Sequence, residues 1–242
     1  MNTSRTATVP DKDTARVFVL DNQPVIHAGL TALIEGRDDL CVCGAACSIH
    51  DAMTELQRHT PDALVMGLCF AEHSCLDMIR EIRRRWPAMG ILVLAGYDET
   101  VFAERVLRAG ANGYIMTSRP PEEVLAALSQ VLSGKTYLSA PVASGIIQSA
   151  LHPHNGRSAL AHLSDREMEV FEMIGRGRSM RDIARVFSRS IKTIETHREH
   201  IKIKLGLTCS RELTQNAAQW LMGERGRQWE PEDSRRMRDI GV

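Results

Sequence analysis

The chain has 242 residues, 43% of them hydrophobic and 25% charged, which is typical of a globular protein with room for two domains. Its apolar runs are far shorter than the ~20 residues of a membrane span, and its polar first 16 residues lack the apolar core of a secretion signal, so we expect a cytoplasmic protein. The net charge is zero but uneven, because residues 1–132 carry 12 basic and 17 acidic side chains whereas residues 163–242 carry 16 and 13.

The first half alternates strand-like and helix-like segments. Its strand candidates share a nearly continuous apolar character, which suits strands covered on both faces, and they are 16–21, 40–46, 63–68, 91–96 and 113–116. An amphipathic helix candidate follows each strand, at 24–35, 48–59, 75–86, 99–109 and 121–133. Five strand–helix repeats predict an α/β domain over 16–133 with a doubly wound parallel sheet, after a disordered stretch at 1–15.

The second half changes to a purely helical pattern. Residues 134–159 predict a linker that holds one short helix near 141–150. Ser164 and Glu167 then have the spacing of a capping box at the start of a helix. The remaining helix candidates are 179–187, 190–205, which ends at Gly206, and 211–222, for which Ser210 is the expected cap. The charged tail at 223–242 is expected to be disordered.

The segment 179–205 has the form of a helix-turn-helix, a short helix followed by a tight turn and a longer basic helix that enters the DNA major groove. The spacing of Ile194, Ile201 and Leu205 predicts that these residues face the core. The candidate DNA-contacting residues are Lys192, Thr193, Glu195, Thr196, Arg198, Glu199, Lys202 and Lys204. The basic side chains suit phosphate contacts, and the glutamates suit base edges. The alternative is a solvated face whose charges pair along the helix.

Residues 163–207, "LSDREMEVFEMIGRGRSMRDIARVFSRSIKTIETHREHIKIKLGL", resemble the DNA-binding domain of LuxR-type transcription regulators. The match includes the L-[ST]-x-R-E opening, the S-x-K-T-[VI]-x-x-H recognition helix and the K-L-G ending. The resemblance implies an all-α, four-helix helix-turn-helix domain at 160–222 whose last helix commonly mediates dimer contacts. A homodimer on an inverted-repeat site of double-stranded DNA follows from it.

The first half resembles the receiver domain of response regulators in the NarL/FixJ class, through "VLDNQPVIHAGLTALIE", "PDALVMGL", "LVLAGYDE" and "LRAGANGYIM". The resemblance implies a five-stranded sheet in the flavodoxin-like order. A working receiver of this kind has two acids after the first strand, an aspartate that takes the phosphoryl group at the end of the third, a hydroxyl residue at the end of the fourth and a lysine at the end of the fifth.

This sequence departs from that pattern at four positions. Asp21 keeps the first acid, but the other positions of the degenerate phosphorylation site hold Asn22, Gly67, Ala95 and Thr117. Tyr114 keeps the switch aromatic. One carboxylate is a poor magnesium site, and glycine offers no nucleophile for an aspartyl phosphate. Asp62 begins the third strand, at the wrong end of the sheet to substitute.

The sequence predicts no enzyme, cofactor or metal site, because it contains no catalytic triad, P-loop or G-x-G-x-x-G motif. Cys41, Cys43 and Cys47 lie close enough in sequence for a thiolate site, although small buried side chains are the favoured interpretation. We therefore expect a DNA-binding transcription regulator that acts independently of phosphorylation. Two alternatives remain, a regulator gated by a small ligand or protein on the degenerate pocket, and an interaction partner of intact regulators that does not recognise DNA sequence.

Overall fold

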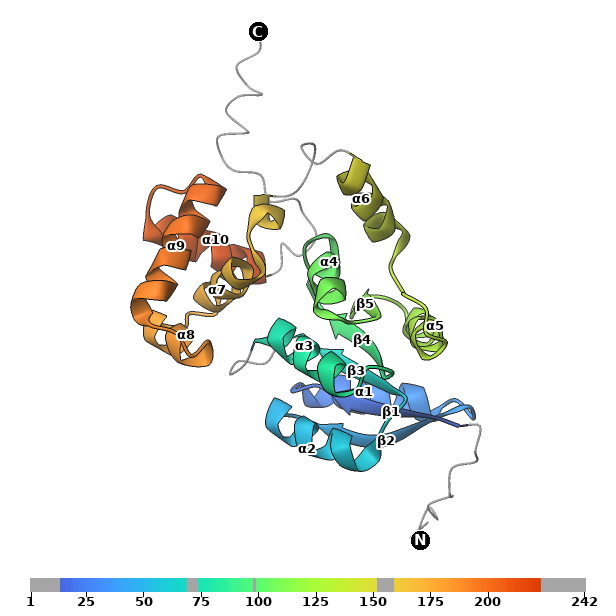
Figure 1. Cartoon of the computed structure of the whole chain (residues 1–242). Helices are drawn as coiled ribbons and strands as arrows, with labels where there is room; N and C mark the ends of the chain where they lie inside the picture. The colour runs from blue at the N-terminus through green and yellow to red at the C-terminus, as the bar shows by residue number, and fades with distance from the viewer. Residues whose placement is uncertain (1–13, 69–73, 98, 152–158, 223–242) are drawn as a thin grey trace.

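The computed structural model of the chain describes residues 14–68, 74–97, 99–151 and 159–222 (Figure 1). Most of the predicted disordered N-terminus, residues 1–13, and the predicted disordered tail, residues 223–242, lie outside the described residues. No helix in the described part of the chain is long and apolar enough to cross a membrane.

The first half forms a five-stranded parallel sheet in the order β2-β1-β3-β4-β5. Its strands are β1 (Ala15–Leu20), β2 (Leu40–Ala46), β3 (Ala63–Gly67), β4 (Gly90–Ala95) and β5 (Gly113–Met116). Each lies within one residue of its predicted position. Every residue of β3 and β4 is buried, as their continuous apolar sequence requires, because helices cover the sheet on both faces.

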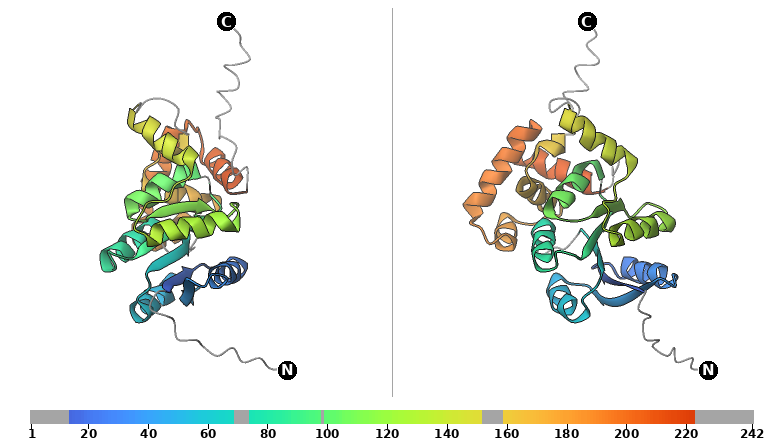
Figure 2. Two further views of the ribbon diagram at one scale, coloured as in Figure 1. Left: turned by 90° about the vertical axis from the view of Figure 1, so that its right-hand side faces the viewer. Right: turned by 45° about the vertical axis from the view of Figure 1, so that its right-hand side comes forward.

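Five helices make up the two covering layers (Figure 2). They are α1 (Pro24–Glu35), α2 (Ile49–His59), α3 (Cys75–Arg85), α4 (Glu99–Ala109) and α5 (Pro121–Leu132). The apolar residues of α1 and α5 form one core with the sheet, and those of α2, α3 and α4 form a second core on its other face. Ser48 and Ser74 begin α2 and α3 by accepting hydrogen bonds from backbone N–H groups in the first turn.

The second half is helical throughout. Its elements are α6 (Ala140–Leu151), the 3₁₀ helix η1 (Ala159–His162), α7 (Asp165–Gly175), α8 (Met180–Val186), α9 (Ile191–Leu205) and α10 (Ser210–Met222). The expected capping box at Ser164 and Glu167 is formed, and Gly206 ends α9 with a φ of 67°. Ser210, expected to cap α10, is instead its first helical residue, and the Glu212 carboxylate accepts from the Thr208 N–H just before it.

The helices of the second half bury Phe171, Ile183, Ile194 and Leu213, and these residues are continuous with the core on the α2, α3 and α4 face of the sheet. Gly175 is required where α7 crosses α10, because a Cβ at this position would lie 2.5 Å from the backbone oxygen of Ala217. This helical domain packs with α7 and α10 toward α3 and α4, while α9 lies on the side away from the sheet (Figures 1 and 2). The fold is therefore a receiver-like α/β domain docked against a helix-turn-helix domain.

Candidate functional sites

The five residues of the predicted degenerate site all lie at the carboxyl end of the parallel sheet. Asp21 and Asn22 follow β1, Gly67 and Ala95 end β3 and β4, and Thr117 follows β5. The Thr117 N–H donates to the Ala95 oxygen at 2.9 Å, which ties β5 to β4 at this edge. Asp21, Gly67 and Ala95 are buried, whereas Asn22 and Thr117 are exposed.

The Asp21 carboxylate lies directly over Gly67. A Cβ built on Gly67 would lie within 3.0 Å of Asp21 Oδ2 and 3.1 Å from Asp21 Cγ, so there is no open hollow above this glycine. Asp21 is 3% exposed, and burial raises the pKa of its carboxyl above the usual 3.8. Its Oδ1 accepts from the Gln23 N–H at 2.7 Å. The side chain of Gln23, the residue before α1, forms no capping hydrogen bond. The Asp21 carboxylate is the acceptor for the Gln23 backbone N–H at this helix start.

Tyr114 connects this sheet edge to the loop that precedes α4. Its ring is 1% exposed, and its hydroxyl donates to the Tyr97 backbone oxygen at 2.8 Å. The ring of Tyr97 in turn stacks on Trp220 of α10, with centroids 5.3 Å apart. A continuous set of contacts therefore runs from β5 to the helical domain.

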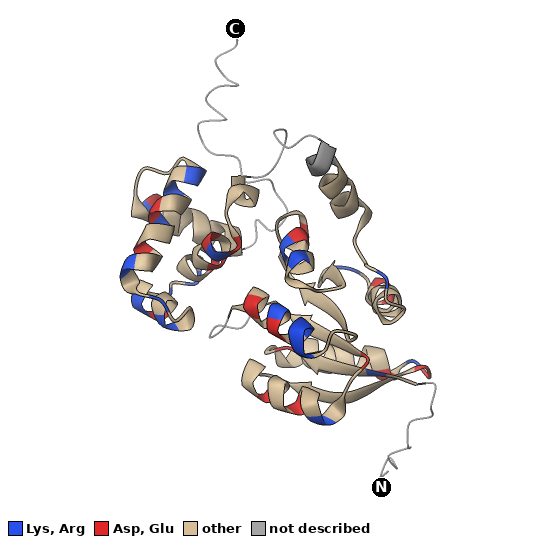
Figure 3. Cartoon of the chain, viewed as in Figure 1, with Lys and Arg blue, Asp and Glu red and all other residues tan. Residues whose placement is uncertain are grey.

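The predicted DNA-contacting residues lie along α9. Ile194, Ile201 and Leu205 are buried against the helical core, as their spacing predicted. On the rest of the helix Thr193, Arg198 and Lys202 are half-buried, and the remaining five candidates, Lys192, Glu195, Thr196, Glu199 and Lys204, are exposed. Acidic and basic residues are mixed along this helix (Figure 3).

Two of the predicted phosphate-contacting lysines already have carboxylate partners. Lys202 lies 2.7 Å from Glu199, and this hydrogen bond lowers the pKa of the Glu199 carboxyl. Lys204 lies 2.7 Å from Glu167 of the capping box. Burial alone would raise the pKa of Glu167, but Lys204 and the Ser164 donors outweigh it and lower that pKa. Lys192, by contrast, is exposed and forms no ion pair with another residue in the described part of the chain.

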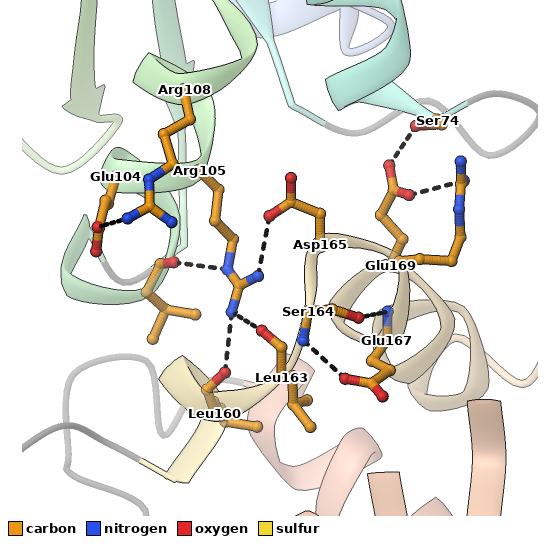
Figure 4. Close-up of polar contacts among 12 residues, drawn as sticks. Ser74, Glu104, Arg105, Arg108, Leu160, Leu163, Ser164, Asp165, Glu167 and Glu169 are labelled. Carbon is orange, nitrogen blue, oxygen red and sulfur yellow. Dashed lines mark hydrogen bonds and ion pairs between the residues drawn. The ribbon is translucent and has the colours of Figure 1, made fainter. Parts of the chain in front are cut away.

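The contact between the domains was not predicted from the sequence, and Arg105 of α4 is its most buried polar residue (Figure 4). Its Nη2 donates to the backbone oxygens of Leu160 and Leu163, at 3.1 and 2.7 Å, and its Nη1 to Asp165 at 3.1 Å. One signal was available, because Arg105 interrupts the otherwise apolar stripe that Val101 begins. A charged residue in such a stripe needs buried partners.

Residues 14–68, 74–97, 99–151 and 159–222 contain no group of three or more His, Cys, Asp or Glu side chains placed to hold a metal ion. Cys41 and Cys43 are half-buried in β2 and Cys47 is exposed just beyond it. Burial raises the pKa of the Cys43 thiol. These residues therefore give no support to the thiolate site.

Comparisons with known proteins match both halves. Residues 17–129 match the response regulator receiver domain, and residues 161–217 match the bacterial regulatory proteins of the luxR family. The chain is 30% identical over 208 residues to the oxygen regulatory protein NreC of Staphylococcus haemolyticus (strain JCSC1435), covering 84% of this chain and 96% of that protein.

Solved structures share the fold. RcsB from Salmonella enterica serovar Typhimurium, bound to promoter rprA, has a TM-score of 0.70 at 21% identity, over 85% of this chain and 98% of that chain. A two-component response regulator of the LuxR family from Aurantimonas sp. SI85-9A1 has a TM-score of 0.54 at 29% identity, over 57% of this chain and 99% of that chain. With a receiver fold at its start, a helix-turn-helix domain at its end and a relative matched over nearly its whole length, the chain belongs to the response regulators that carry a LuxR-type DNA-binding domain.

Proposed function

We propose that this response regulator is a sequence-specific DNA-binding transcription regulator that acts without aspartyl phosphorylation of its receiver domain. The observation that carries the proposal is the Asp21 carboxylate over Gly67. Position 67 corresponds to the phosphorylated aspartate of the family. Here it has no side chain, and the space above it is filled by a carboxylate engaged with the start of α1.

The chemistry of the sheet edge supports this proposal. Phosphoryl transfer to a receiver needs a carboxylate nucleophile and a magnesium ion held by oxygen ligands. Asp21 is the one acid left at the positions of the degenerate site, and burial raises the pKa of its carboxyl. A single carboxyl supplies too few oxygen ligands for a divalent cation.

The placement of α9 supports DNA binding without a preceding signal. The helix lies away from the receiver domain, and its exposed residues are not covered by the sheet or its helices (Figure 1). RcsB of Salmonella enterica serovar Typhimurium has been described bound to promoters in the presence of the phosphomimetic BeF3-, and RcsB dimers have been described on DNA. We infer a homodimer on an inverted repeat for this chain also, with Lys192 in contact with phosphate and Glu195 and Glu199 at base edges.

Two measurements test the proposal. Incubation of the full chain with acetyl phosphate and Mg²⁺ is expected to give no phosphoryl adduct in the intact mass, and an acid-labile adduct would refute the receiver part. Selection of genomic fragments by the untreated protein is expected to enrich a defined sequence. Failure to prefer any fragment over random competitor DNA would refute the DNA-binding part.

Substitutions in α9 test the assigned roles. Lys192→Met is expected to weaken binding to all sequences alike and to reduce the salt slope by about one unit, since one phosphate contact is lost. Lys135→Met, at an exposed lysine after α5, is the matched control and should change neither quantity. Glu195→Gln should instead change the preferred base at one position. A uniform loss of affinity from Glu195→Gln would mean that the roles are assigned wrongly.

A further inference from the structure

Two carboxylates of α7 point into the interface between the domains and accept hydrogen bonds from the receiver. Glu169, whose side chain is 12% exposed, accepts from the Ser74 hydroxyl at the start of α3. Glu172, 14% exposed, accepts from the Tyr97 hydroxyl at 2.8 Å. Each also has an arginine of its own helix, Arg166 at 2.9 Å from Glu169 and Arg176 at 2.8 Å from Glu172.

The two carboxylates line a small cavity between the domains. The cavity beside them has a volume of about 40 Å³, enough for one or two water molecules. Both glutamates line it together with apolar side chains, among them Leu68, Phe102 and Met173. Docking therefore removes most of the solvent contact of the two carboxylates, which is unfavourable for their charged forms.

This desolvation changes the acidity of both groups. Burial raises the pKa of Glu169 from the usual 4.5 to about 7, although Ser74 and Arg166 act in the opposite direction. Burial likewise raises the pKa of Glu172, despite Arg176 and Tyr97. At neutral pH Glu169 is thus close to half protonated while the domains are docked.

The charged groups around Glu169 come from α7, α3 and the loop before α8. Arg166 and Glu172 lie on α7, and Asp77 and Arg80 lie on α3. Asp77 forms ion pairs with Arg80 and Arg166, each at 2.8 Å. Arg80 forms a further ion pair with Asp165 at 2.7 Å. Arg178, which precedes α8, also lines the cavity. The pKa of Asp77 is lowered, because Arg166 and Arg80 outweigh its burial, so Asp77 stays charged where Glu169 titrates. Glu72 and His73 lie outside the described residues.

We propose that the interface between the receiver and helical domains is a pH-responsive latch, which closes as the solution becomes mildly acidic and opens as it becomes alkaline, through protonation of Glu169 opposite Ser74. When the domains separate, Glu169 regains water and binds its proton less tightly. The docked state therefore takes up a proton that the separated state releases, and acid favours docking.

The expected change in the docking equilibrium follows from the pKa values of Glu169 in the docked and separated states. With a pKa of about 7 when docked and 4.5 when separated, the docking equilibrium constant rises about tenfold between pH 8 and pH 6. Glu172 acts in the same direction. Because α9 faces away from the receiver, the latch alters the freedom of the whole helical domain and the accessibility of α10 and does not uncover α9.

The first test measures the proton itself in the full chain. Carboxyl ¹³C NMR, with Glu169→Gln to assign the signal, is expected to give a pKa for Glu169 near 7. Linkage is reciprocal, so weakening the docking must lower that pKa. Arg105→Ala removes the donor to Leu160 and Leu163 without changing any residue of the helical domain, and it is expected to move the pKa of Glu169 toward 4.5.

The second test measures the domain separation. In the Arg105→Ala background, where docking is weakened by the loss of the bonds to Leu160 and Leu163, small-angle scattering is expected to give a larger radius of gyration at pH 8 than at pH 6. Adding Glu169→Gln, which keeps the size and neutrality of the protonated group, should abolish this difference. Adding Glu122→Gln, at an exposed carboxylate on α5, is the matched control and should preserve it.

Three results would overturn the latch. They are an ordinary pKa for Glu169 in the wild-type chain, a raised pKa that persists in Arg105→Ala, and a pH-dependent separation that survives Glu169→Gln. The last result would assign the titration to another group, such as His73 or Glu72.

Discussion

Replacing Gly67 by alanine tests whether Asp21 fills the space at the end of β3. The added Cβ would lie within 3.0 Å of Asp21 Oδ2 and 3.1 Å from its Cγ, inside van der Waals contact. Asp21 is buried and engaged with the Gln23 N–H, so its carboxylate must move and give up that bond. Overpacking of this kind costs about 1–3 kcal/mol, so Gly67→Ala is expected to lower the free energy of unfolding by that amount.

A double-mutant cycle isolates the contact between the two residues. Asp21→Ala removes the obstructing carboxylate, so Gly67→Ala should cost at least about 1 kcal/mol less in that background than in the wild type. Gly29→Ala is the control, because Gly29 lies within α1 with nothing within 4 Å of its would-be Cβ. That substitution should stabilise the domain by about 0.5–1 kcal/mol.

Urea unfolding followed by the fluorescence of Trp86, at the end of α3, reports on the receiver domain. Trp220 and Trp229 are replaced by phenylalanine in every variant so that Trp86 gives the only indole signal. Two results would show that Asp21 does not occupy this space. One is that Gly67→Ala, like Gly29→Ala, does not lower the free energy of unfolding. The other is that the effects of Gly67→Ala and Asp21→Ala on the free energy of unfolding are additive to within about 0.5 kcal/mol.

Three further predictions concern stability. Lys204→Met should lower the free energy of unfolding by about 1.5 kcal/mol in denaturant titrations, since it leaves the buried Glu167 carboxylate without its cation, whereas Lys192→Met should not. Asp21→Asn should be more stable than wild type at pH 7. The pKa of Asp21 is raised in the folded state, so protonated Asp21 stabilises the fold at low pH. This stabilisation is lost as the pH rises through the folded-state pKa. The free energy of unfolding of Asp21→Asn should lack this pH dependence. Gly175→Ala should cost about 1–3 kcal/mol in thermal unfolding of the helical domain, because the methyl meets the backbone of α10.

Much of the fold could be predicted from local patterns. The strands of this sheet are buried on both faces, so continuous apolar runs identify them, and 40–46 and 113–116 have the predicted bounds. Capping at Ser48 and Ser164 follows from residue types three positions apart, which interact within one helical turn. Such interactions are local, and sequence spacing determines them.

The domain interface could not be predicted in the same way. Glu169 and Glu172 have the spacing of ordinary exposed residues on α7, and nothing near them in the sequence indicates Ser74 or Tyr97 as partners. The position of Asp21 was missed for a related reason. Its role as the first acid follows from the family resemblance, but the turn of its carboxylate over residue 67 depends on the absence of a side chain 46 positions later.

The close crossing of α7 and α10 at Gly175 has a mechanical consequence. At this crossing Gly175 lies against the Ala217 backbone with the Leu221 side chain beside it, and such close packing makes the two helices move together. Trp220 on α10 and the two glutamates on α7 therefore belong to one stiff body. A molecule that binds the end of α10 would therefore also displace the carboxylates of α7, although it does not contact them.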